Sequence, residues 1–234
     1  EIGDINSEET AIAAFTNTRK VGDLSVSKAL VSDRAADKNQ LFTFTIQLSE
    51  QLTGTYGDIE FTNGAAEIEL LGSETKTAVG LPIGTGFVVE EVTVDGLINV
   101  EKINDTGEIT EELTETVFTN EREKGDLEVD KTVISDKAAD ADLEFSFTIV
   151  LNDKSVSGVY GDMTFIYGEA TFTLKGGQKA IAEGLPTEIE YEVTEAEAVG
   201  FTTESDGEQG TITTTKSTAS FTNTRETGGF SVSK

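Results

Sequence analysis

A lysine, a glutamate and an asparagine recur on the apolar side of β-type stretches of this sequence. In LSVSK, Leu24, Val26 and Lys28 are spaced two residues apart, and such side chains point to the same face of an extended strand. The same alternation places six polar side chains on apolar faces: Lys28, Glu91 and Asn120, and then Lys131, Glu195 and Asn223. Each half of the chain is therefore expected to point an amine, a carboxyl group and a carboxamide into its interior.

Three interpretations account for one such set. In the first, Lys28 and Glu91 form a buried ion pair capped by Asn120; in the second, Lys28 lies at a strand end and extends its amine to solvent. In the third, burial favours the neutral amine and the neutral acid. The amine then attacks the carboxamide of Asn120, Glu91 shuttles the proton, ammonia leaves, and an isopeptide bond remains. The recurrence of all three residue types argues against coincidence.

Internal repetition organises the chain. The stretch VGDLSVSKALVSDRAADKNQLFTFTIQL (21–48) returns as KGDLEVDKTVISDKAADADLEFSFTIVL (124–151). The asparagines of the FTN motifs and the lysines of the SxK and DxK motifs each recur in steps of 103 residues (120 − 17 and 131 − 28). The sequence predicts two complete repeats, 21–123 (repeat one) and 124–226 (repeat two). The tail of a preceding repeat (1–20) and the head of a following repeat (227–234) are expected to flank them.

The secondary structure is predicted to be almost wholly β. Segments such as LFTFTIQL, LEFSFTIVL and YEVTE alternate apolar with polar residues, and YGD, NG, KGG and GLP are interpreted as turns between strands. SDRAADK and SDKAAD are too short to form more than a turn or a helical loop. We therefore expect an all-β chain in which each repeat of about 103 residues is an Ig-like, two-sheet sandwich.

The ordered set xVxK…F(T/S)FT…YG…GLPxxxxYxVxE…FTNTR resembles the Gram-positive pilin isopeptide-linkage repeat, related to Cna B-type stalk domains, over essentially the whole chain. The resemblance implies a β-sandwich in which an autocatalytic Lys–Asn bond, assisted by Glu, joins the first and last strands. By position, the sets are Lys28, Glu91 and Asn120, and Lys131, Glu195 and Asn223. Repeat one reads FVVEE where repeat two reads YEVTE, which makes Glu90 a rival. Alternation favours Glu91, because Glu90 shares a face with Val88.

Such bonds would give the chain a mechanical role. In a tandem array, tension enters before Lys28 and leaves after Asn120, so a bond between them bypasses the intervening residues. We expect a stiff stalk or pilus-shaft segment of a bacterial surface adhesin, extracellular and attached to the cell wall through other parts of the parent protein. Its chemistry would be single-turnover self-crosslinking, so the chain is not expected to be an enzyme. The alternative is an adhesin module that binds a host protein or glycan through its loops; the equal Lys-to-Asn lengths favour the stalk.

The composition limits the kinds of molecule that the chain is expected to bind. Lys and Arg number 17 against 44 Asp and Glu, a net charge of −27, which works against binding to nucleic acid. The absence of Cys and His excludes the usual zinc, iron–sulfur and haem ligands and Cys–His nucleophiles; no cofactor or metal is expected. No apolar run approaches the roughly 20 residues of a membrane span, so no membrane insertion by this segment is expected. The acidic stretch EIGDINSEET is not expected to be a signal peptide.

Two weaker motifs carry less weight. Asp33 with Asp37, or Asp136 with Asp140 and Asp142, could supply calcium ligands, but the D-x-D-x-D-G spacing is missing. A solvated acidic loop is the expected alternative. LPIGTG (81–86) superficially resembles a sortase signal, but its fourth position is Gly and its counterpart in repeat two is LPTEIE. It is not expected to be a sorting signal.

The two ends carry unpaired half-sites. Asn17 has no lysine of its own repeat within the sequence, and Lys234 has no asparagine. We hypothesise that a strand at 10–19 of one molecule pairs with a strand at 228–234 of another and stacks molecules end to end. Such a join would be non-covalent, because it lacks the glutamate. The other expected partners are neighbouring repeats of the same chain.

Overall fold

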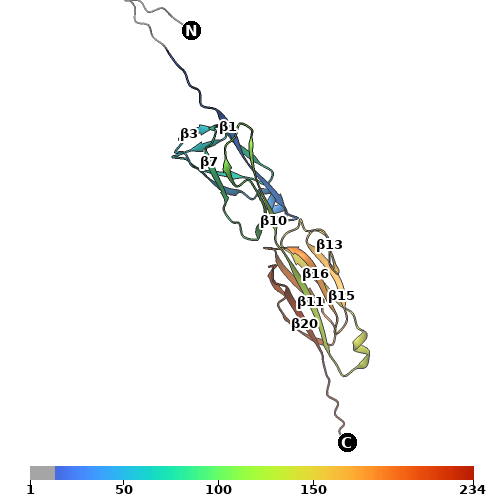
Figure 1. Ribbon diagram of the computed structural model, residues 1–234. Coiled ribbons are helices and arrows are strands. Elements are labelled where there is room, and N and C mark those ends of the chain that lie inside the picture. Colours follow the sequence, from blue (N-terminus) through green and yellow to red (C-terminus); the bar gives the residue numbers. More distant parts are fainter. Residues whose placement is uncertain (1–13) are drawn as a thin grey trace, which may run out of the picture.

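The computed structural model describes residues 14–234, in which two β-sandwiches follow one another end to end (Figure 1). Repeat one comprises β1 (Val21–Val31), the 3-10 helix η1 (Ala35–Asn39), β2 (Phe42–Leu48), β3 (Gly54–Tyr56), β4 (Ile59–Phe61), β5 (Ala65–Leu70), β6 (Thr75–Pro82), β7 (Gly86–Glu91), β8 (Leu97–Ile103), β9 (Thr106–Glu108) and β10 (Thr114–Arg122). Repeat two comprises β11 (Lys124–Ile134), the 3-10 helix η2 (Ala138–Asp142), β12 (Phe145–Leu151), β13 (Gly158–Tyr160), β14 (Met163–Phe165), β15 (Glu169–Leu174), β16 (Lys179–Pro186), β17 (Glu190–Glu195), β18 (Phe201–Asp206), β19 (Gln209–Thr211) and β20 (Ser217–Arg225).

Each repeat packs one four-stranded sheet against another. In repeat one the sheet orders are β6-β1-β10-β8 and β5-β2-β7-β9, with β3-β4 as a separate hairpin; repeat two has the same orders with its own strands. The first and last strands of each repeat are neighbours at the centre of one sheet and run parallel to each other. The predicted all-β sandwich is confirmed, and the pairing of first with last strand closes each repeat on itself.

The alternation seen in the sequence builds the two cores. In β2, Phe42, Phe44, Ile46 and Leu48 are buried while the residues between them are partly or fully exposed. Each repeat has its own cluster of buried apolar side chains, as expected of two independent sandwiches. One prediction was wrong: GLP is not a turn, because these residues are the last three of β6 and of β16. Their leucines, Leu81 and Leu185, are buried at the core.

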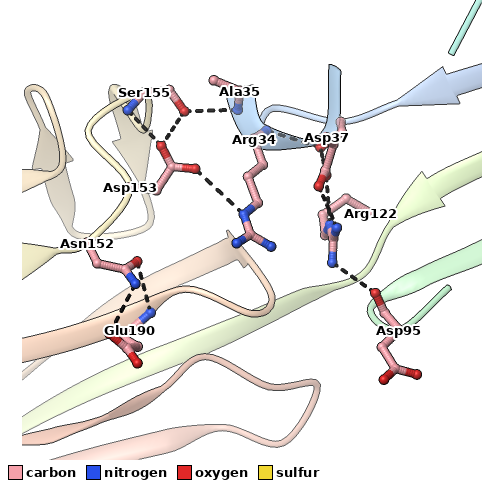
Figure 2. Close-up of polar contacts among 10 residues, drawn as sticks. Arg34, Ala35, Asp37, Asp95, Arg122, Asn152, Asp153, Ser155 and Glu190 are labelled. Carbon is pink, nitrogen blue, oxygen red and sulfur yellow. Dashed lines mark hydrogen bonds and ion pairs between the residues drawn. The ribbon is translucent and has the colours of Figure 1, made fainter. Parts of the chain in front are cut away.

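The junction between the repeats is short and held by polar contacts (Figure 2). Only Glu123 separates β10 from β11, and its backbone N–H donates to Gly96 O (2.9 Å) while its carbonyl accepts from Thr187 N (2.9 Å). On another side, Ala35 N donates to Ser155 Oγ (3.0 Å), and Arg34 Nε lies 3.7 Å from Asp153 Oδ2. Repeat two therefore continues the line of repeat one without a free linker.

The chain ends beyond the sandwiches contain no strand in the described part of the molecule. Residues 14–20 and 226–234 have no assigned secondary structure, and Asn17 and Lys234 are exposed. Phe15 is 90 % exposed and does not face a core, unlike its counterparts Phe118 and Phe221. The proposed end-to-end pairing concerns a second molecule and partly falls on 10–13, outside the described residues; it stays a prediction. No helix among residues 14–234 is long and apolar enough to cross a membrane.

Candidate functional site

The parallel pairing of β1 with β10 brings Lys28 and Asn120 to the same interior. Lys28 lies opposite Phe118, and Asn120 lies opposite Leu30, two residues further along both strands. Residues two apart share a face, so the lysine and the asparagine both point inward from neighbouring strands. Lys28 is 2 % exposed and Asn120 is 3 % exposed. The fold itself therefore places an amine and a carboxamide side by side in the core.

Glu91 reaches the same place from the facing sheet. It is the last residue of β7, and its Oε1 lies 3.0 Å from Lys28 Nζ and accepts a hydrogen bond from Asn120 Nδ2 at 2.9 Å. The side chains of Lys28 and Glu91 are 0 % and 4 % exposed, so the lysine does not extend to solvent. Glu90, the rival residue, is exposed. One carboxylate oxygen thus contacts both groups that the sequence singled out.

Repeat two brings together the matching residues. Lys131 Nζ lies 2.9 Å from Glu195 Oε2, and Asn223 Nδ2 donates to the other carboxylate oxygen, Oε1. Lys131 and Asn223 are buried, and the Glu195 side chain is 3 % exposed. All six predicted residues therefore lie in two dry clusters of three, whereas Asn17 and Lys234 lie in neither.

Aromatic rings cover the lysines. Lys28 Nζ lies 4.3 Å from the centroid of the Phe42 ring, and Lys131 Nζ lies 4.4 Å from that of Phe145. Burial lowers the pKa of both lysines from the usual value, and the hydrogen bonds and charges of Glu91 and Glu195 oppose that shift only in part. A lowered lysine pKa increases the fraction of neutral, nucleophilic amine.

A comparison with known protein families identifies the repeats. A family model described as "Domain of unknown function (DUF7601)" matches residues 22–122 and again residues 125–225. The chain belongs to this family. Among curated proteins, the pilus tip adhesin Cpa of Streptococcus pyogenes is 43 % identical over 79 residues, which cover 31 % of this chain and 12 % of Cpa. The DUF7601 chain thus spans only a small part of the length of that relative.

Solved structures share the architecture of the DUF7601 pair. The major pilin protein T-13 of Streptococcus pyogenes is similar with a TM-score of 0.55 and 17 % identity, over 89 % of this chain and 100 % of the pilin. The major pilin protein T3.2 of the same species is similar with a TM-score of 0.56 and 17 % identity, over 88 % of this chain and 99 % of the pilin. The resemblance to a Gram-positive pilin repeat of the Cna B type is confirmed at the level of fold.

The acidic loops of the DUF7601 repeats differ from expectation. A solvated loop was predicted, and Asp33, Asp136 and Asp142 are exposed, but Asp37 and Asp140 are buried. Arg122 donates to Asp37 through Nε (2.8 Å) and Nη2 (2.6 Å), and Arg225 does the same to Asp140 (2.8 and 2.6 Å). A guanidinium and a carboxylate in this geometry form a bidentate pair, which ties the 3-10 helix to the last strand. The 103-residue recurrence of these residues was the signal that could have revealed the pairs.

The same pairs govern the protonation of the loop carboxylates. Burial acts to raise the pKa of Asp37, but hydrogen bonds from Arg122 and Ser32 outweigh it and hold that pKa below its usual value. The hydrogen bond from Arg225, with one from Ser135, lowers the pKa of Asp140 to about 2. Among residues 14–234 no cluster of three or more acidic side chains is arranged to hold a metal ion. These carboxylates therefore act as partners of arginine.

Asn99 is a contact of the first cluster that sequence reasoning missed. Its Nδ2 donates to Asn120 Oδ1 (3.0 Å) and to Glu91 Oε2 (3.1 Å). In the second DUF7601 repeat, Thr203 lies opposite Asn223, and the buried Asn223 Oδ1 has no hydrogen-bond partner among the described residues. No alternation or repetition in the sequence marks Asn99, because repeat two does not share it.

Proposed function

We propose that this chain is a load-bearing segment of a bacterial surface pilus or pilus-associated adhesin, locked by one spontaneous Lys–Asn isopeptide bond in each repeat. The bonds join Lys28 to Asn120 and Lys131 to Asn223, with Glu91 and Glu195 as proton shuttles. The observation that supports this most strongly is the pair of buried Lys–Glu–Asn clusters, each between the first and last strands of its sandwich.

The proposed reaction follows from the contacts. Glu91 takes a proton from Lys28, whose neutral amine is favoured by burial because burial lowers the lysine pKa. The Lys28 Nζ lone pair then forms a bond to Cγ of Asn120 while the carbonyl π pair moves onto Oδ1. Glu91 Oε1 is within hydrogen-bonding distance of Asn120 Nδ2, so it can deliver a proton there and accept one from Nζ. The Cγ–Nδ2 bond breaks, ammonia leaves, and the secondary amide remains.

The position of each bond suits it to carry tension. The two bonded strands are parallel and adjacent, and the chain enters each repeat through the first and leaves through the last. A crosslink there closes a loop of 92 residues (120 − 28, and likewise 223 − 131), which loop-entropy reasoning equates to roughly 4–5 kcal/mol of stabilisation. Between Asn120 and Lys131 only the ten residues 121–130 carry load as ordinary chain. The sandwich could then not be drawn out by force.

The similar proteins support a place on the bacterial cell surface. The matched curated protein is named a pilus tip adhesin, and the similar folds are major pilins. By this likeness, the parent of the chain is an extracellular, cell-wall-attached protein of a Gram-positive bacterium, and the chain is one of its structural segments and not a turning-over enzyme. Neighbouring repeats and further pilus subunits are its proposed partners.

Intact-protein mass spectrometry tests the proposal. The wild-type chain is expected to be lighter than its sequence by two ammonia molecules. Glu91→Ala and Glu195→Ala are each expected to lack only one, because each removes the proton shuttle of one repeat. A mass equal to that of the unmodified sequence would leave two buried ion pairs and refute the crosslinked stalk.

A further inference from the structure

The edge strand beside the first cluster is bulged, and its counterpart in repeat two is regular. In the β8–β10 pair, Glu101 pairs with Thr119 and Asn99 pairs with Asn120, so Val100 is an extra residue. In the β18–β20 pair, the register continues without a break through Thr203 and Asn223. Bulges re-aim side chains and are frequent next to active sites. Here the bulge accompanies an asparagine that has no equivalent in the other repeat.

Asn99 contacts the atom on which charge would develop. Attack on Cγ of Asn120 converts its carbonyl oxygen into an oxyanion, and Asn99 Nδ2 already donates to that Oδ1 at 3.0 Å. Donors fixed at 2.7–3.1 Å from a developing oxyanion commonly speed acyl transfer. The same Nδ2 also contacts Glu91 Oε2, while Oε1 faces Lys28 and Asn120. The two carboxylate oxygens are thereby assigned to different partners.

We infer that Asn99 is the oxyanion donor for crosslinking in repeat one, and that repeat two crosslinks without such a donor. This inference rests on the proposed isopeptide chemistry. As Lys28 Nζ bonds to Cγ, negative charge on Oδ1 is stabilised by the Asn99 N–H. Collapse of the tetrahedral intermediate breaks Cγ–Nδ2, and ammonia leaves with the proton delivered by Glu91. In repeat two the buried Asn223 Oδ1 has no donor among the described residues.

The expected consequence is a difference in rate between two otherwise matched sites. Repeat one crosslinks faster than repeat two in the same molecule. Asn99→Leu keeps the approximate size of the side chain and removes the donor. It is expected to slow the crosslinking of repeat one by about 10- to 100-fold. This is at or below the low end of the rate losses seen when one oxyanion donor is removed, because Asn99 lies at the exposed edge of the site. Repeat two is unchanged and serves as the internal control.

A time course on the full chain measures both rates. The chain is made by cell-free translation, samples are quenched in acid, and digestion releases the joined peptide of each repeat for quantitative mass spectrometry. Asn99→Gln, which keeps the amide donor, is expected to retain part of the rate that Asn99→Leu loses. In a Lys28→Met background, where repeat one cannot crosslink, thermal unfolding with and without Asn99→Leu shows whether the substitution acts on folding instead.

The outcomes separate this inference from the proposed function. Slowing confined to repeat one, with little change in thermal unfolding, supports the donor role. Joined peptides in both repeats at rates that Asn99→Leu leaves unchanged would overturn the donor role and leave the crosslinked stalk intact. Slowing that is matched by a large loss of stability in the Lys28→Met background would also overturn it. The absence of joined peptides from the wild-type chain would overturn the proposed function and this inference together.

Discussion

The two repeats keep the same buried cluster but differ in what surrounds it. Lysine, glutamate and asparagine are held in both by the parallel pair of first and last strands and by one strand of the facing sheet. The edge strand differs: repeat one has Asn99 at the cluster, whereas repeat two has Thr203 opposite its asparagine. The central strands therefore fix the three clustered side chains, and the two repeats differ at the periphery of the sandwich.

The largest difference between the repeats is expected when one of the proposed crosslinks is removed. Under the proposed chemistry, Asn120→Ala or Asn223→Ala prevents one bond and leaves the Lys–Glu pair in place. Each should lower the stability of its own repeat by roughly 4–5 kcal/mol, because both bonds close loops of the same length. Scanning calorimetry of each variant should show one transition shifted to lower temperature, with the other repeat as the control. Unshifted transitions in both variants would show that the bonds add nothing to stability.

The arginines that pair with Asp37 and Asp140 should be the next most sensitive positions. Removing one partner of a buried ion pair costs about 3–5 kcal/mol because the other charge stays buried. The Arg122 side chain is 4 % exposed and that of Arg225 is 26 % exposed, so Arg122→Met should cost more than Arg225→Met. Denaturant unfolding, in Asn120→Ala and Asn223→Ala backgrounds respectively, measures the two losses. Equal losses would mean that the docked repeat two does not protect the pair at the junction.

Acid should reveal the same pairs without mutation. The pKa of Asp140 is lowered to about 2 from an ordinary 3.8. As pH falls, this carboxylate therefore takes up a proton at a higher pH in the unfolded chain than in the folded chain. The stabilisation is therefore complete above about pH 4 and is lost as pH falls towards 2. Asp37 also has a lowered pKa and should act in the same direction. Unfolding in the Asn223→Ala background should show this acid dependence, and Arg225→Met should reduce it.

The sequence alone was sufficient to predict which lysine, glutamate and asparagine point inward, but not which residues surround them. Period-two alternation shows the inward direction of Lys28, Glu91 and Asn120. Recurrence supports it, because the lysine and the asparagine return after 103 residues and the glutamate after 104. The same logic separated Glu91 from the exposed Glu90. It requires only that each strand be recognised, which strongly alternating segments allow.

Contacts that depend on the register between distant strands could not be predicted from alternation and repetition. Asp37 and Arg122 are 85 residues apart, and their pairing depends on how a short 3-10 helix folds over the end of β10. Asn99 reaches Asn120 through a bulge in an edge strand, and a bulge leaves little trace in the hydrophobic pattern. The acidic loop was therefore predicted to be solvated, although its central carboxylate is buried against arginine.

The polar contacts between the two repeats provide a test of the junction. Arg34→Ala combined with Ser155→Ala removes two side-chain contacts across it, each worth about 1 kcal/mol or less, and leaves the backbone hydrogen bonds of Glu123 in place. The repeats should then sample a broader range of orientations. Because the chain has no cysteine, spin labels at Val79→Cys and Val199→Cys can report the distance distribution. Lys137→Ala, the equivalent of Arg34 in repeat two, is the matched control. A distribution as narrow as that of wild type would show that the short connection alone sets the geometry.

The smallest expected effect concerns a turn that the repeats build from different residues. Tyr167 and Asn63 both have φ of 52°, and each backbone N–H is held at 3.0 Å by a hydroxyl of an earlier residue, Ser157 or Thr53. Asparagine tolerates this left-handed conformation better than tyrosine. Tyr167→Asn should therefore stabilise repeat two by up to about 1 kcal/mol, and Asn63→Tyr should destabilise repeat one by a similar amount. Thermal unfolding in Asn223→Ala and Asn120→Ala backgrounds measures these shifts. A loss of stability in Tyr167→Asn would mean that packing of the tyrosine ring outweighs the strain of its backbone.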